Sequence, residues 1–334
     1  MKYISISTPL IKNSQNFLKI KKNAPFQSLK YLLKRIIFVG WGRKKSGLWA
    51  VKTAKLTNNK FLLLEDGFIR SFGLGVEGSP SFSIVKDNIG IYYDATTTSR
   101  LEKIYNSYDF KSDKRLMAVA KEAIEKIVEH KVSKYNNFKE VDLNYLNNDK
   151  EKVLIINQTY KDSSLEYGLG DSFTTKEMID DAINDNPNAE IYIKIHPDVL
   201  SGKKKSDIEL KDIPASCHIL EDNANPIELL QYFDKVYTKT SGMGMEALLL
   251  NREVFCYGMP FYAGWGATHD KILESRRTRK LTTTELFAGA YILYSSYYNP
   301  YLNQKSDILS TIDYIFNFIE RERLKKPFCE HFIL

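Results

Sequence analysis

The stretch VYTKTSGMGMEALLLNREVFCYGMPFYAGWG, residues 236–266, limits the possible folds of this chain more than any other. Its apolar first residues predict a buried strand that ends near Thr238, its middle predicts a helix over residues 244–250, and residues 253–257 predict a second strand. A strand, turn, helix and strand in this order form one unit of a parallel α/β sheet. The alternative is an ordinary crossover whose glycine turn has no further role.

Several residues at the predicted turn and helix start are candidates for binding a ligand. Backbone N–H groups at a helix N-terminus lack helical partners and lie at the positive end of the helix dipole, so the turn favours a phosphate. Ser241 adds a hydroxyl next to Thr240, and Gly242 and Gly244 allow a ligand to approach the backbone closely. Glu246, in the first helical turn, is positioned to accept hydrogen bonds from a ribose.

The composition excludes several classes of protein. A net charge of +7, from 48 basic and 41 acidic residues, is too small for a dedicated nucleic-acid-binding protein and suits an anionic substrate or membrane surface. No apolar run approaches the roughly 20 residues that cross a bilayer, and the N-terminal residues are too polar for a secretory signal. We expect a cytoplasmic protein with free thiols, whose membrane attachment, if any, is peripheral and assisted by Lys19, Lys21, Lys22, Lys34 and Arg35.

Two adjacent carboxylates follow a predicted buried strand in the first half of the chain. Residues 36–42 and 61–64 predict buried strands, and Glu65 and Asp66 come directly after the second, with Arg70 close behind. Open α/β sheets hold their active sites at the carboxyl ends of strands. We therefore expect Glu65 and Asp66 to be catalytic and Arg70 to bind substrate. The alternative is a solvated Asp-Gly turn.

Polar residues also follow two predicted strands of the second half, residues 153–156 and 190–195. These polar residues are Gln158, Asp162, Lys194 and His196. Because the carboxyl ends of parallel strands meet at one edge of a sheet, we expect them to share a cleft with the Ser241 turn. The alternative for His196 is a packed imidazole that binds nothing.

The alternation of strands and helices predicts an α/β fold of the GT-B-like type, with two Rossmann-type domains facing each other across a cleft. We predict an N-terminal domain, residues 1–145, a C-terminal donor-binding domain, residues 150–300, and a helix within residues 301–334 that crosses back to the first domain. Residues 82–85 and 89–93 predict a hairpin. Without an Asp-x-Asp, a P-loop or a Gly-x-Ser-x-Gly pattern, the sequence favours a sugar donor with one phosphate and no metal.

Several motifs in a fixed order resemble the KpsC/LipA capsule polysaccharide family, the β-Kdo transferases. They are GWG near Trp41, LEDGFIRSFGLG from Leu64, GIYYDATTTSRLE from Gly90, SKYN from Ser133, NQTYKDSS from Asn157, KIHPDVLSGKK from Lys194, TSGMGMEALL from Thr240 and YGMPFYAGWG from Tyr257. The Glu-Asp-Gly and His-Pro elements also resemble those of bacterial sialyltransferases, which use a CMP-activated acidic sugar. The resemblance covers nearly the whole chain.

The resemblance implies a retaining glycosyltransferase that moves Kdo from CMP-Kdo to a lipid-linked oligosaccharide in capsule or related surface glycan biosynthesis. It implies Asp162 as the catalytic aspartate, Glu65 and Asp66 as the acidic pair on the acceptor side, and no cofactor or metal besides the donor. Around CMP we expect Gln158, Lys194, His196, Thr240, Ser241, Gly242 and Glu246. The implied partners are other capsule biosynthesis and export proteins at the inner face of the inner membrane, and no nucleic acid.

The chain departs from this family in three respects. Full-length KpsC proteins carry two such modules and this chain has one, Asn157 stands where many relatives have Asp, and Gly242-Met243 stands where Gln is frequent. The residues leave two other functions open: a transferase for another CMP-activated acidic sugar, and a catalytically silent glycan-binding subunit of a capsule assembly complex. The joint presence of Asp162, Glu65, Asp66 and His196 favours a transferase over the silent subunit.

Overall fold

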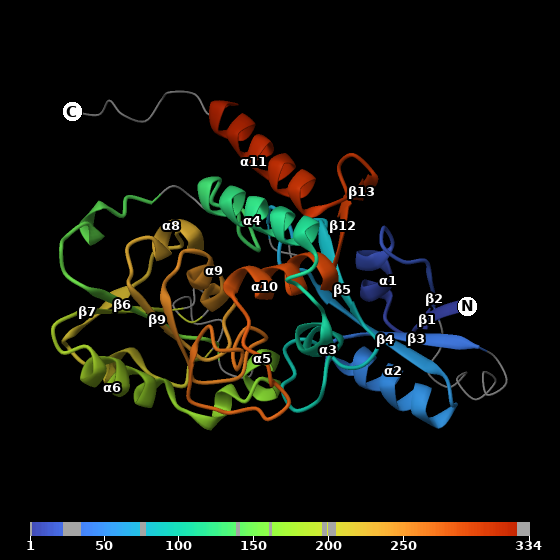
Figure 1. The fold of residues 1–334 in the computed structure, drawn as a ribbon, viewed down its shortest axis with the longest axis horizontal. Coiled ribbons are helices and arrows are strands. Elements are labelled where there is room, and N and C mark those ends of the chain that lie inside the picture. The colour runs from blue at the N-terminus through green and yellow to red at the C-terminus, as the bar shows by residue number, and fades with distance from the viewer. Residues whose placement is uncertain are drawn as a thin grey trace.

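Two β-sheets with helices packed on them make up the part of the chain that the structure describes (Figure 1). The computed structural model describes residues 2–22, 35–73, 78–137, 141–159, 162–195, 199 and 205–325. The two sheets lie side by side, one in each domain, and each contains a run of parallel strands joined through helices. This arrangement confirms the predicted GT-B-like α/β fold.

The first sheet is mixed and has seven strands in the order β13-β12-β5-β4-β3-β1-β2. Strands β2, β1, β3 and β4 run parallel, whereas β5, β12 and β13 pair antiparallel with their neighbours. The bounds are β1 Lys2–Ser5, β2 Ile20–Lys22, β3 Ile36–Trp41, β4 Lys60–Asp66, β5 Ser83–Asp87, β12 Ser295–Asn299 and β13 Gln304–Ser306. The parallel strands are the Rossmann-type half of this sheet, because α1 (Thr8–Ser14) joins β1 to β2 and α2 (Lys45–Leu56) joins β3 to β4.

The predicted hairpin over residues 82–85 and 89–93 is wrong in its second strand. β5 pairs with β4 and β12, and residues 89–93 belong to no strand. The buried Asp87 side chain explains the difference, because its Oδ1 accepts the N–H groups of Ile89 at 2.8 Å and Gly90 at 2.9 Å. These hydrogen bonds hold the chain in a turn where a hairpin strand would extend it.

The second sheet has six strands, all parallel, in the order β11-β10-β9-β6-β7-β8. The bounds are β6 Lys152–Ile156, β7 Glu190–Lys194, β8 Cys217–Leu220, β9 Lys235–Thr238, β10 Glu253–Cys256 and β11 His269–Asp270. The predicted strand-helix-strand unit is confirmed as β9, α9 (Met243–Leu249) and β10. The chain leaves β6 toward β7 and leaves β9 toward β10, in opposite directions. The carboxyl ends of β6 and β9 therefore flank the switch point where open α/β sheets bind ligands.

The other helices cover the sheets and connect the two domains. They are α3 Arg100–Ser107, α4 Lys114–Glu129, α5 Ser163–Tyr167, α6 Thr175–Asp185, α8 Pro226–Leu230, α10 Thr283–Phe287 and α11 Ile308–Lys325, with 3₁₀ turns at Asn144–Leu146, Gly170–Ser172 and Leu210–Asp212 and a π-helix at Ala288–Tyr294. A capping box formed by Thr174 and Glu177 begins α6. Between the domains, the Tyr105 hydroxyl of α3 donates to the carbonyl of Leu286 in α10 at 2.8 Å.

The chain returns to the first sheet before residue 301, earlier than the predicted boundary, because β12 already pairs with β5. From there α11 lies along α4 (Figure 1). Lys126 of α4 forms an ion pair with Asp313 of α11 at 2.6 Å, and the His130 ring stacks on Phe316. The C-terminal part of the described chain is thus packed onto the first domain.

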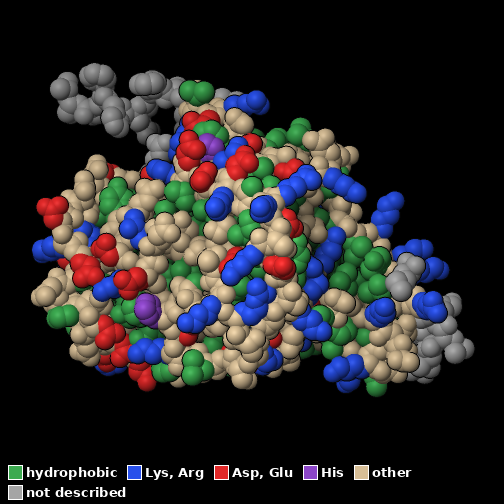
Figure 2. All heavy atoms as spheres, in the orientation of Figure 1, with side chains coloured by type: hydrophobic (Ala, Val, Ile, Leu, Met, Phe, Trp, Pro, Cys, Tyr) green, Lys and Arg blue, Asp and Glu red, His purple; other side chains and the backbone are tan. Residues whose placement is uncertain are grey.

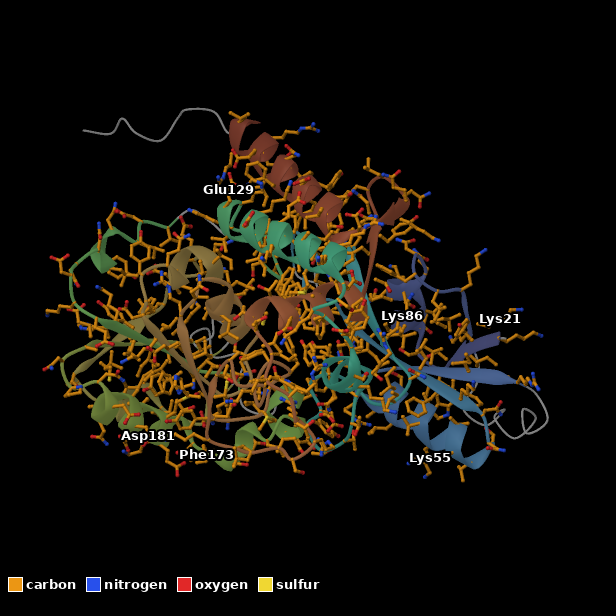
Figure 3. All side chains as sticks on the ribbon, viewed as in Figure 1. Lys21, Lys55, Lys86, Glu129, Phe173 and Asp181 are labelled. Carbon is orange, nitrogen blue, oxygen red and sulfur yellow. The ribbon has the colours of Figure 1, made fainter. Side chains whose placement is uncertain are left out.

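Basic side chains are prominent on the surface of the first-sheet half, while acidic ones gather over the second-sheet half (Figure 2). Lys21 of β2 and Lys55 of α2 both point outward into solvent (Figure 3). Of the basic residues expected to assist membrane attachment, Lys34 lies outside the described residues. None of the described helices combines the length and the apolarity that crossing a bilayer requires.

Candidate active site

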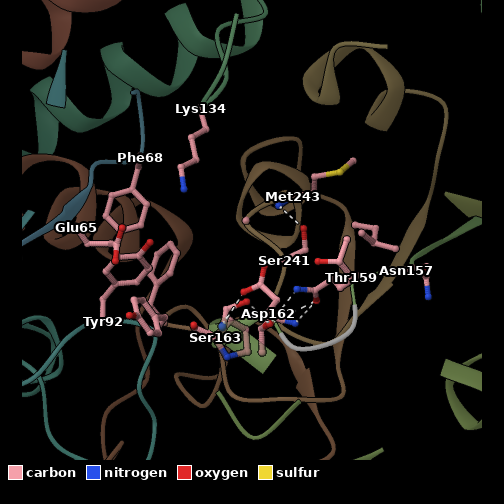
Figure 4. A pocket seen from close by; sticks show the side chains of 18 of the residues that line it. Glu65, Phe68, Tyr92, Lys134, Asn157, Thr159, Asp162, Ser163, Ser241 and Met243 are labelled. Carbon is pink, nitrogen blue, oxygen red and sulfur yellow. Dashed lines mark hydrogen bonds between the residues drawn. The ribbon is translucent and has the colours of Figure 1, made fainter. Parts of the chain in front are cut away.

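A cleft of about 580 Å³ lies between the two domains, at the carboxyl ends of β6 and β9 (Figure 4). Both domains contribute to its walls. The lining residues are Lys44, Glu65, Phe68, Tyr92, Tyr93, Lys134, Ile156, Asn157, Gln158, Thr159, Asp162, Ser163, Ser164, Lys194, Thr240, Ser241, Gly242, Met243, Pro260 and Phe261. The structure therefore brings together most of the residues that the strand ends predict, from both halves of the chain.

The turn after β9 is held by the loop after β6. The Gln158 side chain accepts the backbone N–H of Thr240 at 2.8 Å and donates to the Thr240 hydroxyl at 3.1 Å. Ser164 also lies 3.1 Å from that hydroxyl. Because β6 and β9 are neighbouring parallel strands, their loops leave the sheet at the same edge and can make these bonds.

The two glycines of this turn have different roles. A Cβ on Gly242 would meet no atom within 4 Å, so the backbone here borders open space in the cleft. A Cβ on Gly244 would lie 2.1 Å from the Tyr262 hydroxyl, which donates to the carbonyl of Ser241. Gly242 thus leaves room for a ligand. Gly244 instead leaves room for Tyr262, which holds the turn, so the expectation that Gly244 lets a ligand approach the backbone is wrong.

Asp162 is exposed in the cleft and lies directly before α5. Its Oδ1 accepts the backbone N–H of Ser164 at 2.8 Å, which makes Asp162 the N-cap of α5. Within the described residues, its Oδ2 accepts no hydrogen bond. One carboxylate oxygen thus fixes the side chain while the other is available to a substrate.

Glu65 enters the cleft from the opposite wall, at the carboxyl end of β4. It is half-buried and accepts the Trp41 indole N–H at 2.5 Å. Burial, together with the neighbouring Asp66 charge, raises the pKa of Glu65 to about 7. A carboxyl group with such a pKa can exchange a proton near neutral pH, as a general base requires.

The Gly-Trp-Gly motif at residues 40–42 shapes the surroundings of Glu65. Gly42 has a φ of +37°, and a Cβ there would lie 2.6 Å from the Glu65 carboxylate and 2.2 Å from the Tyr93 hydroxyl. That hydroxyl accepts the backbone N–H of Arg43 at 2.7 Å. Only glycine fits this turn, because any side chain would displace Glu65 or Tyr93.

Asp66 and Arg70 do not line the cleft, so the structure separates them from Glu65. Asp66 forms an ion pair with Arg70 at 3.1 Å. The buried Arg70 also donates to the hydroxyl of Ser71 and the carbonyl of Ser79, each at 2.8 Å. The pair fixes the loop after β4, and Glu65 is the acidic residue that faces the substrate space.

Glu246 does not line the cleft either. Its buried carboxylate accepts a hydrogen bond from Ser133 Oγ at 2.5 Å and another from the backbone N–H of Lys134. Burial raises the pKa of Glu246 to about 7. Glu246 thus joins the second domain to a turn of the first, and the structure does not place it with the other predicted donor-binding residues.

Lys194 is the remaining predicted donor-binding residue that the structure describes. It lines the cleft, donates to the backbone carbonyl of Asp222 at 2.8 Å, and has its pKa lowered by burial. His196 lies outside the described residues. Asn157 turns its amide away from Asp162 (Figure 4) and accepts the Ser206 hydroxyl at 3.1 Å. An amide suits this site because the side chain only forms hydrogen bonds there.

Sequence reasoning missed Lys134 and the aromatic wall of the cleft. The Phe68 ring packs 4.7 Å from Phe261 and 5.0 Å from Tyr92, so aromatic residues of both domains meet beside Glu65. Lys134 comes from the turn after α4, which follows no strand. The one sequence signal for it was its place in the SKYN motif.

Comparisons with known proteins agree with this fold. Residues 37–299 match the family described as capsule polysaccharide biosynthesis protein. The chain is 41% identical over 286 residues to the capsule polysaccharide modification protein LipA of Neisseria meningitidis, covering 83% of this chain and 40% of LipA. It is 36% identical over 273 residues to the lipopolysaccharide-processing protein LpsZ of Rhizobium meliloti, covering 81% of this chain and 62% of LpsZ. The chain thus spans less than two thirds of either relative.

Two solved structures of Thermosulfurimonas dismutans KpsC are also similar. The β-Kdo 2,4 transferase is 40% identical, with a TM-score of 0.86 over 95% of this chain and 98% of that one. The β-Kdo 2,7 transferase is 28% identical, with a TM-score of 0.72 over 95% of this chain and 99% of that one. Two facing α/β domains with a shared cleft give the protein a GT-B-like fold. The chain belongs to the capsule polysaccharide biosynthesis protein family, and within it to the KpsC/LipA type.

Proposed function

We propose that this protein is a retaining β-Kdo transferase that moves Kdo from CMP-Kdo to a glycan acceptor. The observation that carries the proposal is the presence of Asp162 and Glu65, from different domains, in one cleft. Retention by two displacements needs a carboxylate nucleophile and a base for the acceptor hydroxyl. The similarity to the β-Kdo 2,4 transferase supports Kdo as the sugar, and other capsule biosynthesis and export proteins as partners.

The CMP part of the donor is proposed to lie against the second domain. The turn at Thr240, Ser241 and Gly242 borders open space, and Gln158 holds it in place. Lys194 lies at the end of the neighbouring strand β7. The donor is a substrate, and the proposal includes no further cofactor.

The direct test is to incubate the protein with CMP-Kdo and an acceptor that ends in β-linked Kdo, with and without EDTA, and to measure CMP release and product linkage by NMR. We expect acceptor-dependent release and a 2,4 linkage, because identity to the 2,4 transferase is 40% against 28% for the 2,7 transferase. We expect EDTA to have no effect, because the sequence has no Asp-x-Asp and the leaving group has one phosphate.

Other outcomes would change this assignment. Activity that disappears in EDTA and returns with magnesium would contradict a metal-independent transfer. Turnover of CMP-sialic acid in place of CMP-Kdo would identify a transferase for another acidic sugar. Binding of glycan without release of CMP from either donor would identify the silent glycan-binding subunit.

We also propose that the acceptor is lipid-linked and that the protein acts at the cytoplasmic face of the inner membrane. The support comes from α2, which follows the cleft-lining Lys44. Its exposed residues are Lys45, Leu48, Lys52, Lys55 and Leu56. A basic helix face with apolar side chains is attracted to anionic lipids.

Replacing Lys52 and Lys55 together with Glu should weaken cosedimentation with phosphatidylglycerol vesicles, because each basic residue contributes about 1 kcal/mol near such a surface. The matched control replaces Lys111 and Lys121, two exposed lysines elsewhere in the first domain, with Glu. If both double variants bind vesicles as the wild type does, α2 is not the membrane-facing element.

A further inference from the structure

Lys134 enters the cleft from the first domain, near Glu65 and Tyr92 (Figure 4). We propose that its ammonium group binds the carboxylate of an acidic sugar, and so restricts the reaction to sugars that carry one. This inference rests on the function proposed above. Sugars such as Kdo and sialic acid carry a carboxylate on the anomeric carbon itself, whereas neutral sugars have none.

The Lys134 ammonium has no ion pair and no hydrogen bond within the described part of the chain. Its Nζ lies 5.7 Å from the centre of the Tyr135 ring. A half-buried ammonium loses much of its hydration, and an anionic partner offsets that loss. An anionic ligand would therefore supply the partner that the described residues do not.

The other described cations of the cleft are engaged or exposed. Lys194 donates to the carbonyl of Asp222 at 2.8 Å, and Lys44 is exposed to solvent. Arg70, behind the cleft wall, is paired with Asp66. Among the described residues of the cleft, Lys134 is thus the half-buried cation that has no hydrogen bond or ion pair and can bind a ligand.

Lys134 carries its positive charge at neutral pH. Burial by itself lowers the pKa of Lys134, but Tyr92, Tyr135, Asp66 and Glu65 together raise it well above its ordinary value. A carboxylate that binds there meets a full positive charge at every pH at which Glu65 titrates, because the pKa of Glu65 is about 7.

The turn that carries Lys134 is fixed from both domains. The Lys134 backbone N–H donates to Glu246, and its carbonyl accepts the backbone N–H of Arg70 at 2.9 Å. On either side, Ser133 donates to Glu246, and Asn136 donates to the carbonyls of Ser133 and Ser71. The side chain extends from an ordered backbone, so less entropy is lost when a ligand orders its ammonium group.

The carboxylate can come from the donor sugar or from an acidic sugar at the end of the acceptor. Lys134 shares a wall with Glu65, the proposed base for the acceptor, and shares the cleft with Asp162, the proposed nucleophile for the donor. The chemistry of recognition is the same in both cases. The experiment must therefore vary donor and acceptor separately.

The test uses Lys134→Gln, which removes the charge, and Lys134→Arg, which keeps it. Lys121→Gln, exposed on α4, is the matched control. Affinities for CMP and CMP-Kdo are measured by calorimetry in an Asp162→Asn background, which blocks the first displacement. We expect Lys134→Gln to bind CMP-Kdo about 10- to 100-fold more weakly than the control. CMP should bind equally well because it lacks the sugar carboxylate, and this equality also shows that the variant is folded.

Transfer kinetics of the Lys134 variants with Asp162 intact then separate the two sources. A donor affinity that falls identifies the donor carboxylate, and an unchanged donor affinity with a raised KM for the acidic acceptor identifies the acceptor carboxylate. In both cases Lys134→Arg should recover part of the loss. If Lys134→Gln weakens CMP as much as CMP-Kdo, the lysine binds the phosphate and the proposal is wrong. It is also wrong if every constant equals that of the control. A wild-type protein that neither binds nor turns over CMP-Kdo would instead refute the proposed function.

Discussion

Incubation with CMP-Kdo in the absence of acceptor should add the mass of one Kdo residue to the intact protein, and Asp162→Ala should abolish this adduct. In the first displacement, an Asp162 oxygen bonds to the anomeric carbon while the bond from that carbon to the CMP phosphate breaks, and CMP leaves with the electron pair. Oδ2 is the attacking atom in this scheme, because Oδ1 already accepts the Ser164 N–H at 2.8 Å.

Loss of the nucleophile should also reduce transfer on the order of 10⁴-fold or more. The matched control is Glu166→Ala, which removes an exposed carboxylate of α5 that does not line the cleft. Intact-protein mass spectrometry followed by peptide mapping locates the adduct. Full turnover by Asp162→Ala, or an adduct on another peptide, would eliminate Asp162 as the nucleophile.

Glu65→Gln should form the adduct but discharge it to acceptor about 10²- to 10⁴-fold more slowly, the usual contribution of a general base. In the second displacement the acceptor oxygen bonds to the anomeric carbon, Glu65 takes the hydroxyl proton, and the bond to Asp162 breaks. Glutamine keeps an oxygen for the Trp41 N–H, so the wall of the cleft should survive the substitution.

The pH profile gives the Glu65 assignment a second test. A base acts when ionised, and the pKa of Glu65 is about 7, so the discharge rate of the wild type should fall as the pH drops through that value. The Glu65→Gln rate should not follow this titration. Asp66→Asn is the comparison: it should keep the titration but move it to lower pH, because the Asp66 charge helps to raise the pKa of Glu65. Wild-type discharge by Glu65→Gln would show that another group removes the proton.

The sequence was enough to predict at which strand ends the polar residues lie, but not which way their side chains point. Glu65 and Asp66 do end a buried strand, as expected. Successive side chains of a strand point to opposite faces, so two adjacent carboxylates cannot both face one cleft. The packing of the sheet decides which of the two carboxylates faces the cleft, and a single sequence does not reveal that packing.

Long-range contacts account for the other differences. Every residue from Gly244 to Leu249 in α9 is buried, so Glu246 turns toward Ser133, over a hundred positions away along the chain, and does not face the nearby turn. Lys134 was not predicted, because only the packing of the two domains against each other places it in the cleft. Local patterns carry no information about such pairings.

The first sheet draws its strands from both ends of the described chain, because β12 and β13 extend the sheet that β1 to β5 begin. The second domain is therefore inserted into the first and is connected to it twice. A single cut in either connection would leave two pieces held together noncovalently, by the β5–β12 pairing and the α4–α11 contact. Two connections also restrict how the domains can rotate, so a change in the width of the cleft has to bend both of them together.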